Sequence, residues 1–149
     1  MKAIDIAYNI VKHYYSDFDY EDQGEIMSNL KLQKLLYYYQ GFHLAFFERP
    51  AFDEDIYAWQ YGPVVPEVYH SFADKRASII KTDDFNEQYE EITDQQKQLL
   101  HVILDNYGQL NAIALMNLSH QETPWKSTEL LNIISSEKLT SFFKTKIVR

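Results

Sequence analysis

The stretch from Ser28 to Phe47, SNLKLQKLLYYYQGFHLAFF, constrains the fold of this chain more than any other segment. Its core-facing residues recur at steps of three and four, which places them on one face of an α-helix. Ser28 is positioned to cap the first turn with its hydroxyl, and Pro50 ends the segment because it lacks a backbone N–H. A helix of about 20 residues is about 30 Å long, so the rest of the chain must pack around it. The residues of the predicted apolar face are Leu32, Leu35, Leu36, Tyr39, Phe42, His43 and Phe46.

Helical patterns also cover most of the remaining chain. A capping box of Thr93 and Gln96 opens one helix, and Gly108 is expected to end it in the left-handed conformation. Asn111 is expected to cap the next. Further helices are predicted over residues 3–16, from Pro66 onward, and over residues 136–144.

The segment from Ile56 to Trp59 alternates in a way that is typical of an extended strand. The chain has 149 residues with four Gly and four Pro, which are few for a turn-rich β protein. We therefore predict one domain, residues 1–149, that is mainly α. It is expected to be a compact bundle of five to seven helices around the long central helix, with a short extended crossover near Ile56–Trp59.

Charge and composition exclude several classes of function. The formal net charge is −8, and such a surface repels nucleic-acid phosphates and anionic lipids, whereas it attracts a basic protein partner. No apolar run reaches the ~18 residues of a membrane span. The chain contains no Cys, which removes disulfides and thiolate chemistry and agrees with a cytoplasmic location.

Two groups of residues are candidates for chemistry, and both have a simpler interpretation. His120 and Glu122 flank the Pro124–Trp125 corner and could form an acid/base pair, with His70 as a third candidate. The favoured interpretation is that His120 caps a helix and Glu122 binds a backbone N–H. A helical pair, His101 and Asp105, is a weak metal signal and is better explained as a local polar pair. No metal or cofactor site is predicted.

The aromatic residues are better explained by core packing than by partner binding. Tyr37, Tyr38 and Tyr39 span nearly a full helical turn, so at least one is expected to leave the core-facing side. An exposed Tyr could anchor a partner, but we favour core or rim positions for all three. Gly41 in a helix interior indicates that another backbone approaches closely there. Trp59 and Trp125 stand at chain breaks and are expected to wedge elements of the bundle together.

Three blocks taken together resemble the signature blocks of the SocA-like antitoxin family. They are Asn29–Tyr38 (NLKLQKLLYY), Ala58–Tyr69 (AWQYGPVVPEVY) and Leu118–Trp125 (LSHQETPW). The family is also called the Panacea domain, and its members are often labelled phage-associated proteins. The order and spacing of the blocks extend the resemblance over most of the chain.

The resemblance implies an antitoxin that binds a toxin encoded beside it and blocks the toxin by direct contact. It also implies a second mechanism, in which the antitoxin delivers its toxin to a ClpXP-type protease as an adaptor. No catalytic residues and no cofactor come with the family. The candidate partner-binding or motif residues are Lys31, Gln33, Lys34, Tyr37, Tyr38, Trp59, Tyr61, Gly62, Pro63, His120, Glu122, Pro124 and Trp125.

The leading hypothesis is therefore a non-catalytic protein-binding module. It fits the acidic charge, the 12 tyrosines and the absence of known catalytic spacings. Two alternatives stay open at this point. One is a small hydrolytic enzyme that uses His120 and Glu122, and the other is a phage-derived regulatory protein.

Overall fold

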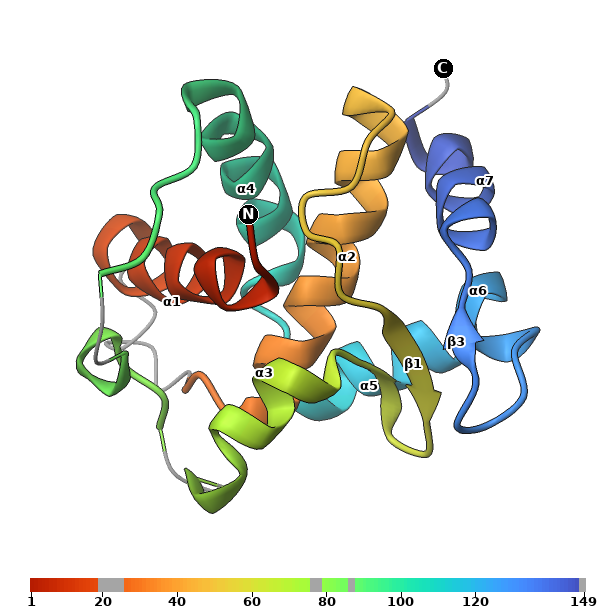
Figure 1. Cartoon of the computed structure of the whole chain (residues 1–149), viewed down its shortest axis with the longest axis horizontal. Coiled ribbons are helices and arrows are strands. Elements are labelled where there is room, and N and C mark those ends of the chain that lie inside the picture. Colours follow the sequence, from red (N-terminus) through yellow and green to blue (C-terminus); the bar gives the residue numbers. More distant parts are fainter. Residues whose placement is uncertain (19–25, 76–78, 86–87, 148–149) are drawn as a thin grey trace.

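The computed structural model describes residues 1–18, 26–75, 79–85 and 88–147. In these ranges a long helix, α2 (Asn29–Phe47), stands at the centre and other helices lie on both sides of it (Figure 1). This confirms the prediction of a mainly α bundle of five to seven helices around a central helix. The surrounding helices are α1 (Ala3–Phe18), α3 (Pro66–Ser71), α4 (Asp94–Tyr107), α5 (Ala112–His120), α6 (Thr123–Lys126) and α7 (Ser136–Ile147). Two short 3₁₀ turns are η2 (Ala73–Lys75) and η3 (Thr82–Asp84).

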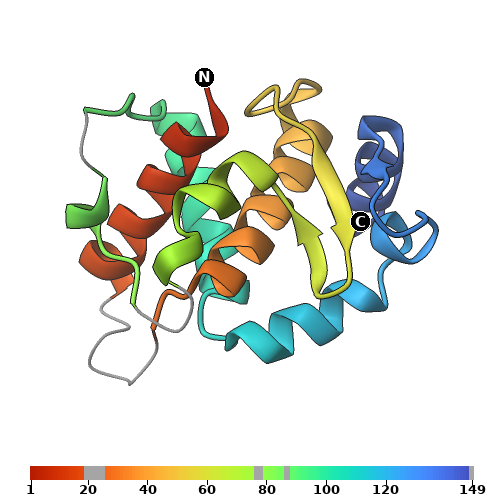
Figure 2. The ribbon, with the colours of Figure 1, turned by 60° about the horizontal axis from the view of Figure 1, so that its bottom comes forward.

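A small antiparallel sheet lies across α2. The predicted extended segment is β1 (Ile56–Trp59), and it pairs with β2 (Gly62–Val64) on one edge and β3 (Ile133–Ile134) on the other. Trp59 is opposite Gly62, so the hairpin turn lies at residues 60–61 and Gly62 begins the second strand. Figure 2 shows this hairpin in front of α2, with α5 passing its tip.

The start of α2 is capped as predicted, but the helix ends at Phe47, before Pro50. The Ser28 hydroxyl accepts a hydrogen bond of 3.1 Å from the Lys31 N–H. At the other end Glu48 takes a left-handed conformation, with φ of 58°, and donates its N–H to the Leu44 carbonyl over 3.0 Å. The long helix therefore owes its limits to capping of orphan backbone groups.

The prediction of a single apolar face on α2 is wrong. From Lys31 to Ala45 every residue except Phe42 is buried. The reason is tertiary: α2 is packed by α1, α4, α5, α7 and β2, so it has no broad solvent face. Polar side chains on this helix must consequently find partners inside the protein.

Buried polar groups of α2 hold the connections that wrap around it. Gln40 Oε1 accepts from the Ala51 N–H over 2.8 Å, and Gln40 Nε2 donates to the Phe52 carbonyl over 2.8 Å. Nδ1 of the buried His43 lies 2.7 Å from the Arg49 carbonyl oxygen. These contacts satisfy the backbone of an otherwise irregular loop.

The close neighbour of Gly41 is a ring and not a backbone. A Cβ atom at this position would overlap the side chain of Phe143 on α7. Gly41 therefore lets α7 approach the middle of α2. All three tyrosines of the run are buried, which confirms the interpretation of Tyr37, Tyr38 and Tyr39 as core residues and shows that none leaves the core.

Several local expectations are corrected. Gly108 has a φ of −64° and is not left-handed; its N–H simply continues the helical pattern to the Leu104 carbonyl. Pro124 lies in the first turn of α6 and so begins a helix, since its missing N–H is an orphan there anyway. The segment 81–91 contains η3 and the buried Phe85, and its residues 86–87 are outside the described ranges. Within the described residues no helix is long and apolar enough to cross a bilayer.

Candidate functional site: the pocket at Lys34

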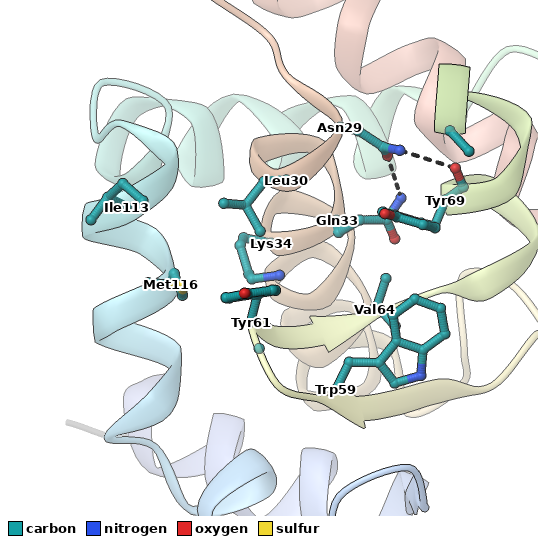
Figure 3. Close-up of a pocket in the computed structure, with 12 residues that line it drawn as sticks. Asn29, Leu30, Gln33, Lys34, Trp59, Tyr61, Val64, Tyr69, Ile113 and Met116 are labelled. Atoms are coloured by element: carbon teal, nitrogen blue, oxygen red, sulfur yellow. Dashed lines mark hydrogen bonds between the residues drawn. The ribbon is translucent and has the colours of Figure 1, made fainter. Parts of the chain in front are cut away.

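A pocket of about 360 Å³ opens where α2, the β1–β2 hairpin, α3 and α5 meet. Figure 3 shows residues of α5 on one side and residues of the hairpin and α3 on the other, with α2 behind. The walls are mostly apolar, and the described lining residues include no acidic side chain and no histidine. They are Asn29, Leu30, Gln33, Lys34, Trp59, Tyr61, Gly62, Val64, Tyr69, Ala73, Ile113 and Met116.

Lys34 supplies a buried amine to this pocket. The residue is 1% exposed, and its Nζ donates to the Pro63 carbonyl oxygen over 2.9 Å. Burial lowers the pKa of Lys34 to about 7, because the charged form loses its hydration. Lys34 thus holds the turn of the hairpin on α2 with an amine that titrates near neutrality.

Gly62 makes room for the lysine stem. Its φ is +109°, which L-residues with a side chain rarely adopt. A Cβ atom added here would come within 2.5 Å of Lys34 Cε and 3.1 Å of Ser119 Oγ. The requirement for glycine is therefore both conformational and steric.

A chain of amide hydrogen bonds fixes the α3 side of the pocket. The Val65 N–H donates to Gln33 Oε1 over 2.8 Å, which replaces the side-chain cap that α3 lacks. Gln33 Nε2 donates to Asn29 Oδ1 over 3.0 Å, and Asn29 Nδ2 donates to the Tyr69 carbonyl over 3.0 Å (Figure 3). Each amide thus donates one hydrogen bond and accepts one in holding the wall.

The rim of the pocket carries exposed apolar side chains. Tyr61 at the hairpin turn is 62% exposed, and Ile113 on α5 is 56% exposed. Beside them, the Trp59 ring packs edge-on against the Tyr69 ring, with 5.3 Å between centroids. The pocket is thus bordered by aromatic and aliphatic side chains that solvent reaches.

The third signature block is tied to this site through Trp59. Trp125 Nε1 donates to the Trp59 carbonyl oxygen over 2.8 Å, and the His120 ring lies on Trp125 with centroids 4.1 Å apart. Trp125 thus joins α6 to the sheet, whereas the Trp59 ring packs on α3. His120 Nε2 is buried and has no hydrogen-bond partner among the described residues.

Glu122 belongs to a buried tyrosine cluster instead. Its Oε1 accepts hydrogen bonds from the Tyr37 hydroxyl over 2.9 Å and the Tyr38 hydroxyl over 3.1 Å. Burial raises the pKa of the Glu122 carboxyl, and burial together with this carboxylate raises the pKa of both tyrosines. The expectation that Glu122 binds a backbone N–H is therefore wrong, and its observed partners make it a bridge between α2 and α6.

Lys31 is also buried, but it lies outside the pocket lining. Its Nζ donates to the Gly108 carbonyl over 2.7 Å and to the Tyr14 hydroxyl over 2.9 Å. The cation lies 4.8 Å from the centroid of the Tyr14 ring. Lys31 thus joins the end of α4 and helix α1 to the central helix.

The pocket gathers part of the predicted residue set and adds others. Gln33, Lys34, Trp59, Tyr61 and Gly62 line it together. Sequence reasoning missed the α5 wall, namely Ile113 and Met116. The sequence of α5 is apolar on several sides, so it does not mark the face that these two residues share.

Fold and pocket together define a helical domain in which one central helix holds a β-hairpin beside an apolar, amine-containing pocket. The model of the family described as "Antitoxin SocA-like, Panacea domain" matches residues 32–126. The chain belongs to this family.

A relative with a curated description supports the assignment. Antitoxin SocA of Caulobacter vibrioides (strain NA1000 / CB15N) is 32% identical over 109 residues. The alignment covers 66% of this chain and 58% of the relative, so the chain spans a little over half of the length of that protein. No solved structure matches the chain.

Proposed function

We propose that this protein is an antitoxin that neutralises a toxin encoded beside it by direct protein–protein contact. We further propose that the toxin binds over the pocket at Lys34. Membership of the SocA-like family and the name of the Caulobacter relative support the first part. The observation that carries the second part is that the first two signature blocks line one pocket and the third is hydrogen-bonded to its hairpin.

Each block contributes to that pocket or to its support. The first block supplies Lys34 and the second supplies the Tyr61–Gly62 turn. The third block is held to the hairpin by the hydrogen bond from Trp125 to the Trp59 carbonyl. The rim residues Tyr61 and Ile113 provide anchors for a partner, because large apolar side chains around a hollow contribute most to binding.

Charge favours a basic toxin surface. With a net charge of −8 the protein attracts a basic partner and speeds encounter at low salt. A hydrolytic function gains no support from the geometry, because Glu122 is buried and bonded to Tyr37 and Tyr38. We therefore assign no catalysis to His120 and Glu122.

Co-expression tests this proposal. The neighbouring reading frame is expressed alone and then together with this protein, and growth, complex formation and toxin level are measured. We expect toxicity that co-expression relieves, a complex that copurifies, and an unchanged amount of toxin. A fall in toxin level that depends on a ClpXP-type protease would instead assign the adaptor mechanism, and unrelieved toxicity would overturn the proposal.

A further inference from the structure

Among the described residues, no acidic side chain pairs with the Lys34 amine. Its one hydrogen-bond partner among the described residues is the Pro63 carbonyl oxygen. A protonated amine carries three N–H donors, so two of them have no acceptor there. Desolvation alone accounts for its lowered pKa, and no carboxylate of the described residues lies close enough to counteract it. Burying a cation without an opposite charge costs free energy, so an anionic hydrogen-bond acceptor would be stabilised at this position.

Lys31 shows by contrast what a satisfied buried lysine looks like in the same helix. Its amine donates to two oxygen atoms and lies over an aromatic ring. Lys34 borders open space instead, and in Figure 3 its nitrogen points away from Ile113 and Met116 toward the side of the pocket that carries Val64. The absence of a side chain on Gly62 keeps this space free.

The remaining surface of the pocket suits an apolar group. Leu30, Trp59 and Met116 provide aliphatic and indole contacts. The amides of Asn29 and Gln33 are engaged with each other and with the backbone. The amine is the basic group among the described lining residues, and a carboxylate is the group that would complete it.

We propose that the pocket binds a carboxylate carried on an apolar body, with the carboxylate on the Lys34 amine and the apolar part against Trp59 and Met116. The carboxylate comes either from a free aromatic or aliphatic acid or from a partner protein that presents a terminal carboxylate on an apolar residue. The chemistry of recognition is the same in both cases. This proposal is independent of the proposed toxin binding, because the affinity for the carboxylate is measured with this protein alone.

Protonation sets the pH dependence of this binding. The carboxylate needs the ammonium form of Lys34, which is depleted as the pH rises above about 7. The affinity for an acid should then fall about tenfold from pH 7 to pH 8.5. Other titratable groups near the site are Tyr61 on the hairpin, Tyr69 and His70 on α3, and His120 on α5. A neutral ligand of the same shape separates the Lys34 contribution from theirs.

The experiment is calorimetric titration of the protein with 3-phenylpropionate and with its uncharged analogue 3-phenylpropanamide. We expect the acid to bind more tightly than the amide, with the stated pH dependence for the acid alone. Lys34→Met should weaken acid binding about tenfold or more and leave amide binding within about twofold. Lys97→Met, on the exposed side of α4, is the matched control and should change neither. Equal affinity for acid and amide, or no binding of the acid, would overturn the proposal.

Two further arms keep the outcome decisive. If Lys34→Met does not fold, the pH profiles of acid and amide on the unaltered protein still decide. A peptide that ends in Phe with a free carboxylate, compared with the same peptide amidated, identifies where the carboxylate ligand comes from. Tighter binding of the peptide acid than of 3-phenylpropionate assigns a protein partner. Tighter binding of 3-phenylpropionate assigns a small acid. If no carboxylate binds while rim variants still abolish toxin binding, this proposal fails and the antitoxin function stands.

Discussion

Glu122 accepts a hydrogen bond from the Tyr37 hydroxyl over 2.9 Å, although 85 residues separate the two along the chain. The bond connects the end of α5 and the start of α6 to the middle of the central helix. A carboxylate in this position is shared with Tyr38, and both rings pack against Phe143 of α7. The carboxylate thus joins the α5–α6 junction to α2, and the tyrosine rings extend this cluster to α7.

Replacement of Glu122 tests the structural role of this cluster. Glu122→Ala leaves two buried hydroxyls without their acceptor and should lower the free energy of unfolding by about 2–4 kcal/mol. Glu122→Gln keeps one acceptor oxygen and should cost less. Denaturant unfolding measures both, and equal stability of Glu122→Ala and the unaltered protein would contradict the account.

The same carboxyl makes stability depend on pH in a known direction. Its pKa is raised in the folded state, mainly by burial, so the folded protein binds more protons than the unfolded chain just above about pH 4.5. The Glu122 contribution to stability is present below that pH and is lost as the pH rises through the folded-state pKa. The unaltered protein should lose stability over this window relative to Glu122→Gln, measured by unfolding at several pH values.

Above neutral pH, Lys34 should make the stability of the protein rise with pH, which is the opposite of the effect of Glu122. Its folded-state pKa is about 7, below the value of 10.5 for an unburied lysine, so the unfolded chain binds more protons between these limits. Stability should therefore rise with pH from about 7 to about 9.5 in the unaltered protein. Lys34→Met should flatten this rise, whereas Lys97→Met should retain it. A stability curve that falls in this window would contradict the lowered pKa.

Gly62→Ala should be strongly destabilising. The substitution forces a side chain into a residue with φ of +109° and brings Cβ within 2.5 Å of Lys34 Cε. The conformational part alone costs about 1–3 kcal/mol. Gln60→Ala, at an exposed neighbouring turn position, should change the melting temperature little. Similar melting temperatures for the two variants would show that the hairpin tolerates a side chain at residue 62.

Gly41 and Phe143 should be energetically coupled. Gly41→Ala creates an overlap with the Phe143 ring and should destabilise the protein by about 1–3 kcal/mol. Phe143→Ala removes the ring and leaves a cavity, which costs about 3–5 kcal/mol. In the double variant the two costs should not add, since the new methyl group fills part of the space. A double-mutant cycle measures this coupling, and strict additivity would refute the contact.

Local chemistry made a large part of the fold predictable. The caps at Ser28, Thr93 and Asn111 were each identified from a hydroxyl or amide before an apolar run, and all three accept the expected backbone N–H. The alternation of Ile56–Trp59 identified β1 in the same way. Such signals involve residues a few positions apart, so a single sequence contains them.

The interior of the central helix was not predictable by these means. Lys31 and Lys34 are charged residue types that periodicity assigns to solvent, yet both amines are buried. Their acceptors, the carbonyls of Gly108 and Pro63, lie 77 and 29 residues away. His120 and Glu122 show the converse case, because two residues adjacent in a motif have different partners in space.

The location of the candidate site was equally hard to predict, because it too depends on contacts between residues that are distant in sequence. The hairpin half of the pocket could be guessed from the Gly62–Pro63 turn and Trp59. The α5 half could not, because the contribution of Ile113 depends on how α5 is docked against β2. An exposed Ile on a helix is unremarkable until a hollow is found beside it.

The most direct test of the account is the affinity of the toxin for two matched surface variants. Ile113→Asp places a charge on the pocket rim, and Val102→Asp places one on α4, at residues that are 56% and 57% exposed. With both variants shown to fold normally, calorimetry or surface plasmon resonance measures the dissociation constant for the copurified toxin. The account predicts that Ile113→Asp weakens binding at least about thirtyfold, equivalent to about 2 kcal/mol, while Val102→Asp leaves it within about threefold. Unchanged affinity for Ile113→Asp, or equal losses in the two variants, would contradict it.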